Sequence, residues 1–209
     1  VQTCALPISS LDKRSIRTRA AICEALIELM DQKGFELLTV TDITQKAKVN
    51  RSTFYLHFRD KYDLVLQLEN EVTQNFEKIL LKDLAINFRE LEKLDTPLPM
   101  VVSMFTYFKE NARMIGALLE LKGELSLQSQ IVKVIQKNIS LGFLLGIKSI
   151  RFSVPAEYLF SYIISAHLGV VQAWIKKGCV ESPDVMAISL AKLSAQGPFR
   201  AIELEFDDI

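Results

Sequence analysis

The sequence has few of the residue types that carry catalytic and metal-binding chemistry. It contains two histidines, His57 and His167, and three widely separated cysteines, Cys4, Cys23 and Cys179. This spacing matches no metal site and no even set of disulfides, which favours a reducing cytoplasm. A G-x-G-x-x-G run, a P-loop, a paired-carboxylate motif and a Cys/His cluster are also missing. We therefore expect no enzyme activity, no cofactor and no metal.

The sequence also has few glycines and prolines, and its formal net charge is zero. The 209 residues include 8 glycines and 6 prolines, 49% are hydrophobic, and 25 basic residues balance 25 acidic ones. This composition predicts an ordered, mostly helical protein with one large or two small domains. Zero net charge argues against coating nucleic acid with the whole surface, but it is compatible with a local basic patch.

Two stretches raise the question of targeting or membrane insertion. Residues 1–9, VQTCALPIS, lack the basic and apolar regions of a signal peptide. They look like translated sequencing-adapter read-through, so we expect a scar. The stretch from Tyr158 to Ile175 has no formal charge and is a marginal transmembrane candidate by length. Ser161, His167 and Gln172 within it would be costly in lipid, so we expect a core or subunit-interface helix and no membrane partner.

The chain is organised around two short helical patterns at about residues 39–58. Thr39 lies three residues before Asp42, which is the spacing of a capping box at a helix start. The apolar residues that follow recur at helical spacing. After a break at Lys48, Asn50 is a good N-cap for a second helix.

The second of these helices has one aromatic face and one polar face. Phe54 and Phe58 are four residues apart, so we expect both to point inward. The opposite side presents Arg51, Ser52 and Tyr55, with Thr53 and His57 at its margins. Two helices joined by a short turn, the second presenting hydrogen-bond donors, form a helix-turn-helix whose second helix can enter the major groove of DNA.

Basic residues flank this motif on both sides. A first helix is predicted over Ser10–Lys33, and its beginning is crowded with Lys13, Arg14, Arg17 and Arg19. Cations are unfavourable near a helix N-terminus. The cluster therefore favours contact with phosphate over the alternative, a solvated face. Asp60 should cap a further helix, and Lys61 at its start is predicted to meet a DNA phosphate.

The run from Thr39 to Leu64, T-V-x-D-I-x-x-x-A-x-V-N-R-S-T-F-Y-x-H-F-x-D-K-x-x-L, resembles the DNA-binding motif of TetR-type transcriptional regulators. The likeness extends back through the first helix to Gly34. It departs at Lys48, where the family usually has glycine; a positive φ there would cost lysine about 1 kcal/mol relative to glycine. The resemblance implies that His57 lies near phosphate, that Lys61 contacts the DNA backbone, and that a small molecule relieves repression. Activation is equally compatible with these residues.

We expect an all-α protein of about nine helices, in which a three-helix head is joined to a C-terminal helical bundle. The predicted DNA-binding domain covers residues 10–76, the regulatory and dimerisation domain 77–195, and a frayed tail 196–209. From Phe105 to Leu193 the sequence more weakly resembles the ligand-sensing half of a TetR subgroup. The helices at Tyr158–Ile175 and Pro183–Ala195 are the predicted interface of a homodimer, because one short recognition helix buries too little surface for tight, specific binding.

Roles can be assigned within both halves. Arg51 and Ser52 are predicted to reach base edges, the arginine in bidentate contact with guanine. The predicted set of contacts with operator DNA is completed by Thr39, Thr41, Asn50, Thr53, Tyr55, His57, Lys61 and Arg17. An effector pocket is predicted to involve Met104, Tyr107, Phe108, Phe143, His167 and Trp174, with plain core packing as the alternative for each. Two other functions remain open: a helical module that binds protein rather than DNA, and a regulator controlled by a partner protein.

Overall fold

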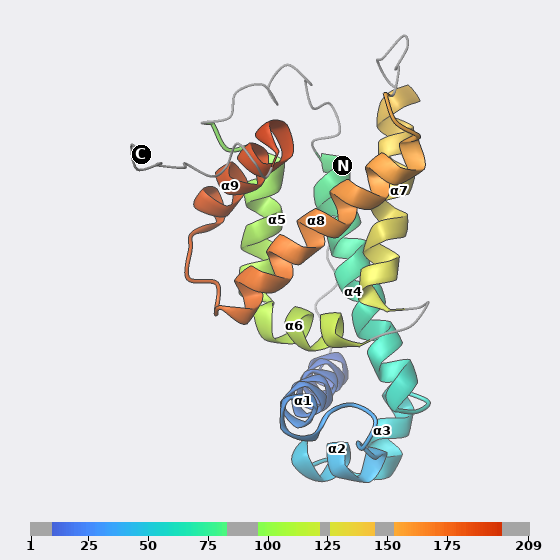
Figure 1. Cartoon of the computed structure of the whole chain (residues 1–209). Helices are drawn as coiled ribbons and strands as arrows, with labels where there is room; N and C mark the ends of the chain where they lie inside the picture. The colour runs from blue at the N-terminus through green and yellow to red at the C-terminus, as the bar shows by residue number, and fades with distance from the viewer. Residues whose placement is uncertain (1–9, 83–95, 122–125, 145–152, 198–209) are drawn as a thin grey trace, which may run out of the picture. The chain divides into compact units, whose positions relative to one another are not determined.

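The computed structural model describes residues 10–82, 96–121, 126–144 and 153–197, and the regular secondary structure of these residues is all helical (Figure 1). The helices in this part of the chain are α1 (Ser10–Lys33), α2 (Val40–Lys46), α3 (Arg51–His57), α4 (Lys61–Lys82), α5 (Pro99–Glu110), α6 (Ala112–Glu120), α7 (Leu127–Leu144), α8 (Ala156–Lys176) and α9 (Pro183–Gln196). The predicted all-α fold of about nine helices is confirmed. The proposed scar at residues 1–9 and most of the predicted tail at residues 196–209 lie outside the described residues.

The chain divides into two compact units, residues 1–70 and 71–209. The division falls within α4, earlier than the boundary predicted after residue 76. Helix α4 is continuous across it, so this one helix contributes residues to both units.

The N-terminal unit is a small helical head with an aromatic and aliphatic core. Helix α1 ends at Gly34, whose φ of 74° suits glycine and whose N–H donates to the Met30 carbonyl at 2.9 Å. Helix α1 contacts α2, and α2 contacts α3. The fully buried side chains that hold these helices together are Ile22, Leu26, Ile43, Phe54, Phe58 and Leu64.

The C-terminal unit is a helical bundle in which α5 lies along α9, while α6 and α7 contact α8 (Figure 1). Its core is aromatic. The rings of Phe105 and Trp174 meet edge to face at 5.2 Å, and Phe76 stacks on Phe108 at 6.0 Å. The indole N–H of Trp174 donates to the Glu181 carbonyl at 3.2 Å, so this buried donor is satisfied.

Capping residues define the ends of the last helices. The Ser182 hydroxyl accepts from the Val185 N–H at 3.4 Å, and Pro183 is the first residue of α9, where its missing N–H is not needed. Pro155 occupies the N-cap position of α8. A proline there has an extended ψ, 131°, so the chain enters the helix only after it.

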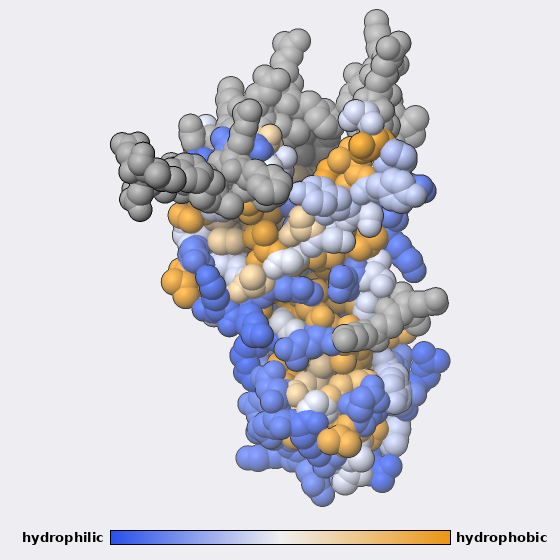
Figure 2. All heavy atoms as spheres, viewed as in Figure 1, coloured by the Kyte–Doolittle hydropathy of each residue, from blue (hydrophilic) through white to orange (hydrophobic). Residues whose placement is uncertain are grey.

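Helix α8 is the long uncharged stretch noted in the sequence. Among the described helices it is long and apolar enough to cross a membrane by length and composition alone, a test that core helices of soluble proteins also pass. One side of it packs into the bundle through Ile164, Leu168, Val171 and Trp174. Its other side is exposed in the single chain, and hydrophobic residues reach the surface around α5, α7 and α8 in Figure 2.

Candidate nucleic-acid interface

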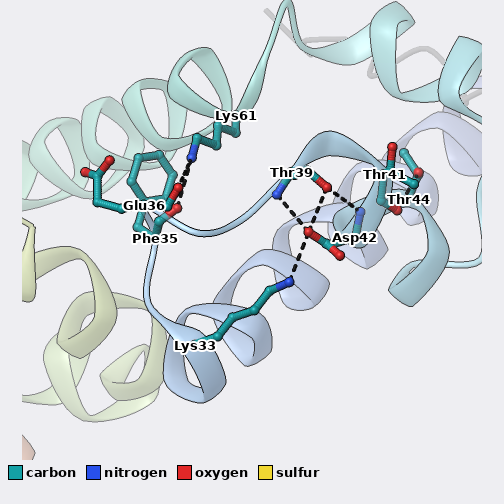
Figure 3. Close-up of polar contacts among 8 residues, drawn as sticks. All are labelled: Lys33, Phe35, Glu36, Thr39, Thr41, Asp42, Thr44 and Lys61. Atoms are coloured by element: carbon teal, nitrogen blue, oxygen red, sulfur yellow. Dashed lines mark hydrogen bonds and ion pairs between the residues drawn. The ribbon is translucent and has the colours of Figure 1, made fainter.

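A capping box fixes the start of α2, as predicted (Figure 3). The Thr39 N–H donates to a carboxylate oxygen of Asp42 at 2.9 Å, and the Asp42 N–H donates to the Thr39 hydroxyl at 3.2 Å. Lys33 adds an ion pair with Asp42 at 3.0 Å. The hydrogen bonds from the Thr39 hydroxyl and N–H, together with Lys33, lower the pKa of Asp42 to about 2. This network joins the end of α1 to the first turn of α2.

The turn between α2 and α3 adopts a left-handed conformation at Lys48. Its φ is 56°, so the positive φ considered from the sequence is present. The turn is closed by the Val49 N–H, which donates to the Thr44 carbonyl at 3.0 Å. A lysine in this region is strained by about 1 kcal/mol relative to glycine. The departure from the family pattern is therefore tolerated without loss of the turn.

Asn50 occupies the N-cap position of α3 with an extended backbone, φ −73° and ψ 150°. The prediction that Asn50 is the N-cap of the second helix is confirmed, although its side chain makes no capping hydrogen bond. Its carbonyl accepts from the Phe54 N–H at 3.1 Å, so the backbone alone starts the helix. The exposed amide of Asn50 remains available to an external partner.

The two faces of α3 are arranged as predicted. Phe54 and Phe58 are buried and their rings meet at 5.6 Å. Arg51, Ser52 and Tyr55 are exposed, while Thr53 and His57 are half-buried. The Arg51 guanidinium donates to the Tyr55 hydroxyl at 3.3 Å, which holds the arginine along the outward face. The DNA contacts of these residues stay predictions.

The other predicted contact residues lie around the motif. Thr39 and Thr41 are exposed near the start of α2, and Arg17 is exposed on α1. Arg19, from the same basic cluster, is half-buried, with its guanidinium 5.8 Å from the centre of the Phe58 ring. The cluster is therefore divided between solvent-facing cations and one that packs on the aromatic core.

Lys61 has a structural role that the sequence did not reveal. Its ammonium donates to the Phe35 carbonyl at 3.0 Å and to the Glu36 carbonyl at 2.9 Å (Figure 3). It also lies 4.7 Å from the centre of the Phe35 ring and 5.1 Å from that of Tyr62. Lys61 thus ties the first residue of α4 to the loop after α1. Its contact with phosphate remains a prediction.

Asp60 caps α4 as predicted. One of its carboxylate oxygens accepts from the Tyr62 N–H at 2.9 Å and from the Asp63 N–H at 2.8 Å. The acid offsets the unfavourable position of the neighbouring lysine at a helix N-terminus.

The sequence-based interpretation missed Leu56. It treated the outward face of α3 as polar, yet Leu56 is 84% exposed. The signal was available, because Leu56 lies midway between the inward-facing Phe54 and Phe58 and so must point away from the core.

The residues predicted for an effector pocket do not share one environment. Phe108 and Trp174 are core residues, and Met104 is half-buried. Tyr107 accepts a hydrogen bond from the Asn75 amide at 3.4 Å, and burial raises its pKa. His167 bonds to the Ser194 hydroxyl at 2.8 Å, and burial lowers its pKa. The side chain of Phe143 lies outside the described residues.

Two family profiles match the chain. "Bacterial regulatory proteins, tetR family" matches residues 22–68, and "Transcriptional regulator C-terminal region", a TetR profile, matches residues 95–196. A 53-residue stretch is 38% identical to the HTH-type dhaKLM operon transcriptional activator DhaS of Lactococcus lactis, covering 25% of this chain and 28% of that protein. A 56-residue stretch is 36% identical to the uncharacterised HTH-type transcriptional regulator YxbF of Bacillus subtilis, covering 26% of this chain and 15% of that protein. Each match spans less than a third of the relative.

Solved structures are similar over most of the chain. NalD, the secondary repressor of the MexAB-OprM multidrug efflux pump in Pseudomonas aeruginosa, has a TM-score of 0.63 at 20% identity, covering 88% of this chain and 97% of NalD. FadR of Bacillus subtilis in complex with stearoyl-CoA has a TM-score of 0.60 at 20% identity, covering 85% of this chain and 98% of FadR. These likenesses concern the fold. The two family profiles, over residues 22–68 and 95–196, show that the chain belongs to the TetR family of DNA-binding transcriptional regulators, which are not enzymes.

Proposed function

We propose that this regulator binds a palindromic operator as a homodimer and represses transcription until a small molecule releases it. The observation that carries the proposal is the outward face of α3. It presents Arg51, Ser52 and Tyr55 to solvent while Phe54 and Phe58 anchor the helix in the head. A helix anchored on one side, with donors on the other, is suited to the major groove.

Base and backbone contacts are divided between two groups of residues. Arg51 reaches a guanine with two hydrogen bonds, and Ser52 reaches a neighbouring base edge. The phosphate backbone is contacted by Thr39, Thr41, Asn50, Thr53, Tyr55, His57, Lys61 and Arg17. Such contacts fix the position of the head on the duplex but carry no sequence information themselves.

The homodimer forms through α8 and α9. In the single chain Tyr158 is 66% and Tyr162 60% exposed on α8, and Val185 and Leu193 are exposed on α9. Apolar and aromatic side chains on adjacent exposed helices are typical of a subunit interface. Tyr162→Glu should yield a monomer in sedimentation velocity, whereas Val180→Glu, at an exposed site outside both helices, should leave the dimer intact. A Tyr162→Glu protein that stays dimeric would place the interface elsewhere.

The DNA-binding proposal is tested by fluorescence anisotropy with duplexes selected from a randomised pool, across a salt series. We expect a selected palindrome to bind far more tightly than the bulk pool and with a steep salt dependence. Weak binding without selection would favour the alternative, in which α3 docks on a protein.

The division of roles is tested by two arginine variants. Arg51→Ala should lose about 1–3 kcal/mol of binding free energy and relax the sequence preference at one base pair per half-site. Arg17→Ala should weaken binding to all DNA sequences alike and reduce the salt dependence of the DNA affinity. Identical behaviour of the two variants would contradict the division.

Release by an effector is tested on the same complex. Because one similar structure is in complex with stearoyl-CoA, long-chain acyl-CoA is a reasonable first probe in a panel of apolar molecules. An effector dissociates DNA only through a higher affinity for the conformation that does not fit the operator. Dissociation by none of the panel would favour control by a partner protein. A reporter gene placed downstream of the operator then shows whether the protein represses or activates transcription. Both outcomes have to be distinguished, because among the similar proteins DhaS is an activator and NalD is a repressor.

A further inference from the structure

Leu56 is more exposed than any other large hydrophobic side chain in the part of the chain that the structure describes. It takes no part in the core of the head, which Phe54 and Phe58 complete on the opposite side of α3. Packing therefore does not explain a leucine here. In Figure 2 the surface of the head is mostly hydrophilic, with small hydrophobic patches over α2 and α3.

The neighbours of Leu56 on the helix surface are the residues that the proposed function assigns to DNA. Side chains three and four positions apart on a helix lie side by side. Ser52 is four residues before Leu56 and Thr53 is three before it, so all three share one face. A ligand seated against Ser52 would therefore cover the leucine.

The chemistry of the major groove limits what this leucine can meet. The edges of the base pairs present donors and acceptors, and the apolar group among them is the C5 methyl of thymine. We propose that Leu56 is a specificity-determining residue that recognises a thymine methyl group in each half-site of the operator. This inference rests on the proposed function, because it requires α3 to enter the major groove.

Deoxyuridine provides the test, since it pairs like thymine and differs only in lacking that methyl group. In the selected operator each thymine is replaced by deoxyuridine, one position at a time and symmetrically in both half-sites, and binding is measured by anisotropy. For the wild-type protein one position should stand out, with affinity reduced about three- to five-fold for each methyl group, the effect of burying one such group. Leu56→Ala should bind the thymine and uracil operators equally, and Leu56→Met should retain part of the preference.

A control separates this effect from a general loss of apolar surface. Leu37 is also strongly exposed in the head, at 73%, but it lies in the loop between α1 and α2. Leu37→Ala should therefore leave the uracil pattern unchanged. Circular dichroism of each variant checks that the head still folds, which we expect because neither leucine is part of the core.

Several outcomes would overturn the proposal. Uracil effects that persist in Leu56→Ala, or that are absent from the wild-type protein, would show that Leu56 reads no methyl group. An equal loss on every duplex in Leu56→Ala would place the leucine against the sugar-phosphate backbone. In all these cases selective, salt-dependent binding would still support the proposed function. Failure to select any operator would instead remove the proposed function, and this inference with it.

Discussion

Replacing Lys61 with methionine tests whether its ammonium group stabilises the head. Methionine keeps most of the apolar stem of lysine, so the change removes mainly the charge and its donors. Two hydrogen bonds are lost, to the carbonyls of Phe35 at 3.0 Å and Glu36 at 2.9 Å. Both carbonyls are then left to water.

The expected magnitude is set by three effects. Hydrogen bonds from a charged donor contribute about 1.5–3 kcal/mol each when buried, and much less at a half-exposed site such as this one. The cation–π contacts with Phe35 and Tyr62 add about 0.5 kcal/mol each. In the opposite direction, removing a cation from a helix N-terminus stabilises the fold by about 0.3–1 kcal/mol. We therefore expect Lys61→Met to lower the free energy of unfolding by about 1–2 kcal/mol.

Urea unfolding followed by circular dichroism gives this difference, and hydrogen exchange locates it. Amides at residues 34–39 and in the first turn of α4 should exchange faster in Lys61→Met. Lys78→Met is a matched control, because Lys78 is an exposed lysine on the same helix. Unchanged stability and exchange, with a shallower salt dependence of DNA binding, would refute the structural role and leave Lys61 as a phosphate contact alone.

Three further predictions concern pH and backbone strain. The folded pKa of Asp42, about 2, lies below the ordinary pKa of an aspartate, 3.8, so the stabilising effect of its carboxylate is complete above pH 3.8 and is lost as the pH falls toward 2. The urea midpoints of wild type and Asp42→Asn should therefore converge over that range, and a constant difference would be contrary to expectation. Burial lowers the pKa of His167 from 6.5, so stability should decrease as the pH falls below 6.5, and His167→Gln should flatten this dependence. Lys48→Gly should raise the free energy of unfolding by about 1 kcal/mol by relieving the positive φ, as measured in urea; a loss of stability would show that the lysine is not strained.

Local patterns in the sequence were sufficient to predict much of the head. The Thr39–Asp42 capping box, the glycine end of α1 and the spacing of Phe54 and Phe58 depend on residues within four positions of one another, so periodicity and capping rules apply to them directly. The orientation of Leu56 followed from the same periodicity, but expecting a polar outward face obscured it.

Long-range contacts could not be predicted in this way. The bond from Lys61 to Phe35 and Glu36 joins residues about 25 positions apart, and no local pattern encodes it. The same limit applies to the ring contact of Trp174 on α8 with Phe105 on α5, which is fixed by the packing of the bundle. Asn50 shows a further limit: its residue type correctly predicted the N-cap position of α3, but not that its side chain makes no capping hydrogen bond.

The position of Trp174 also provides an optical probe of the molecule. It is the single tryptophan in the sequence, and it is buried in the C-terminal unit with its ring against Phe105. Emission excited at the red edge of protein absorption therefore comes from the bundle alone and is silent about the head. A shift of that emission on adding an effector would report repacking between α5 and α8, in a protein that needs no label.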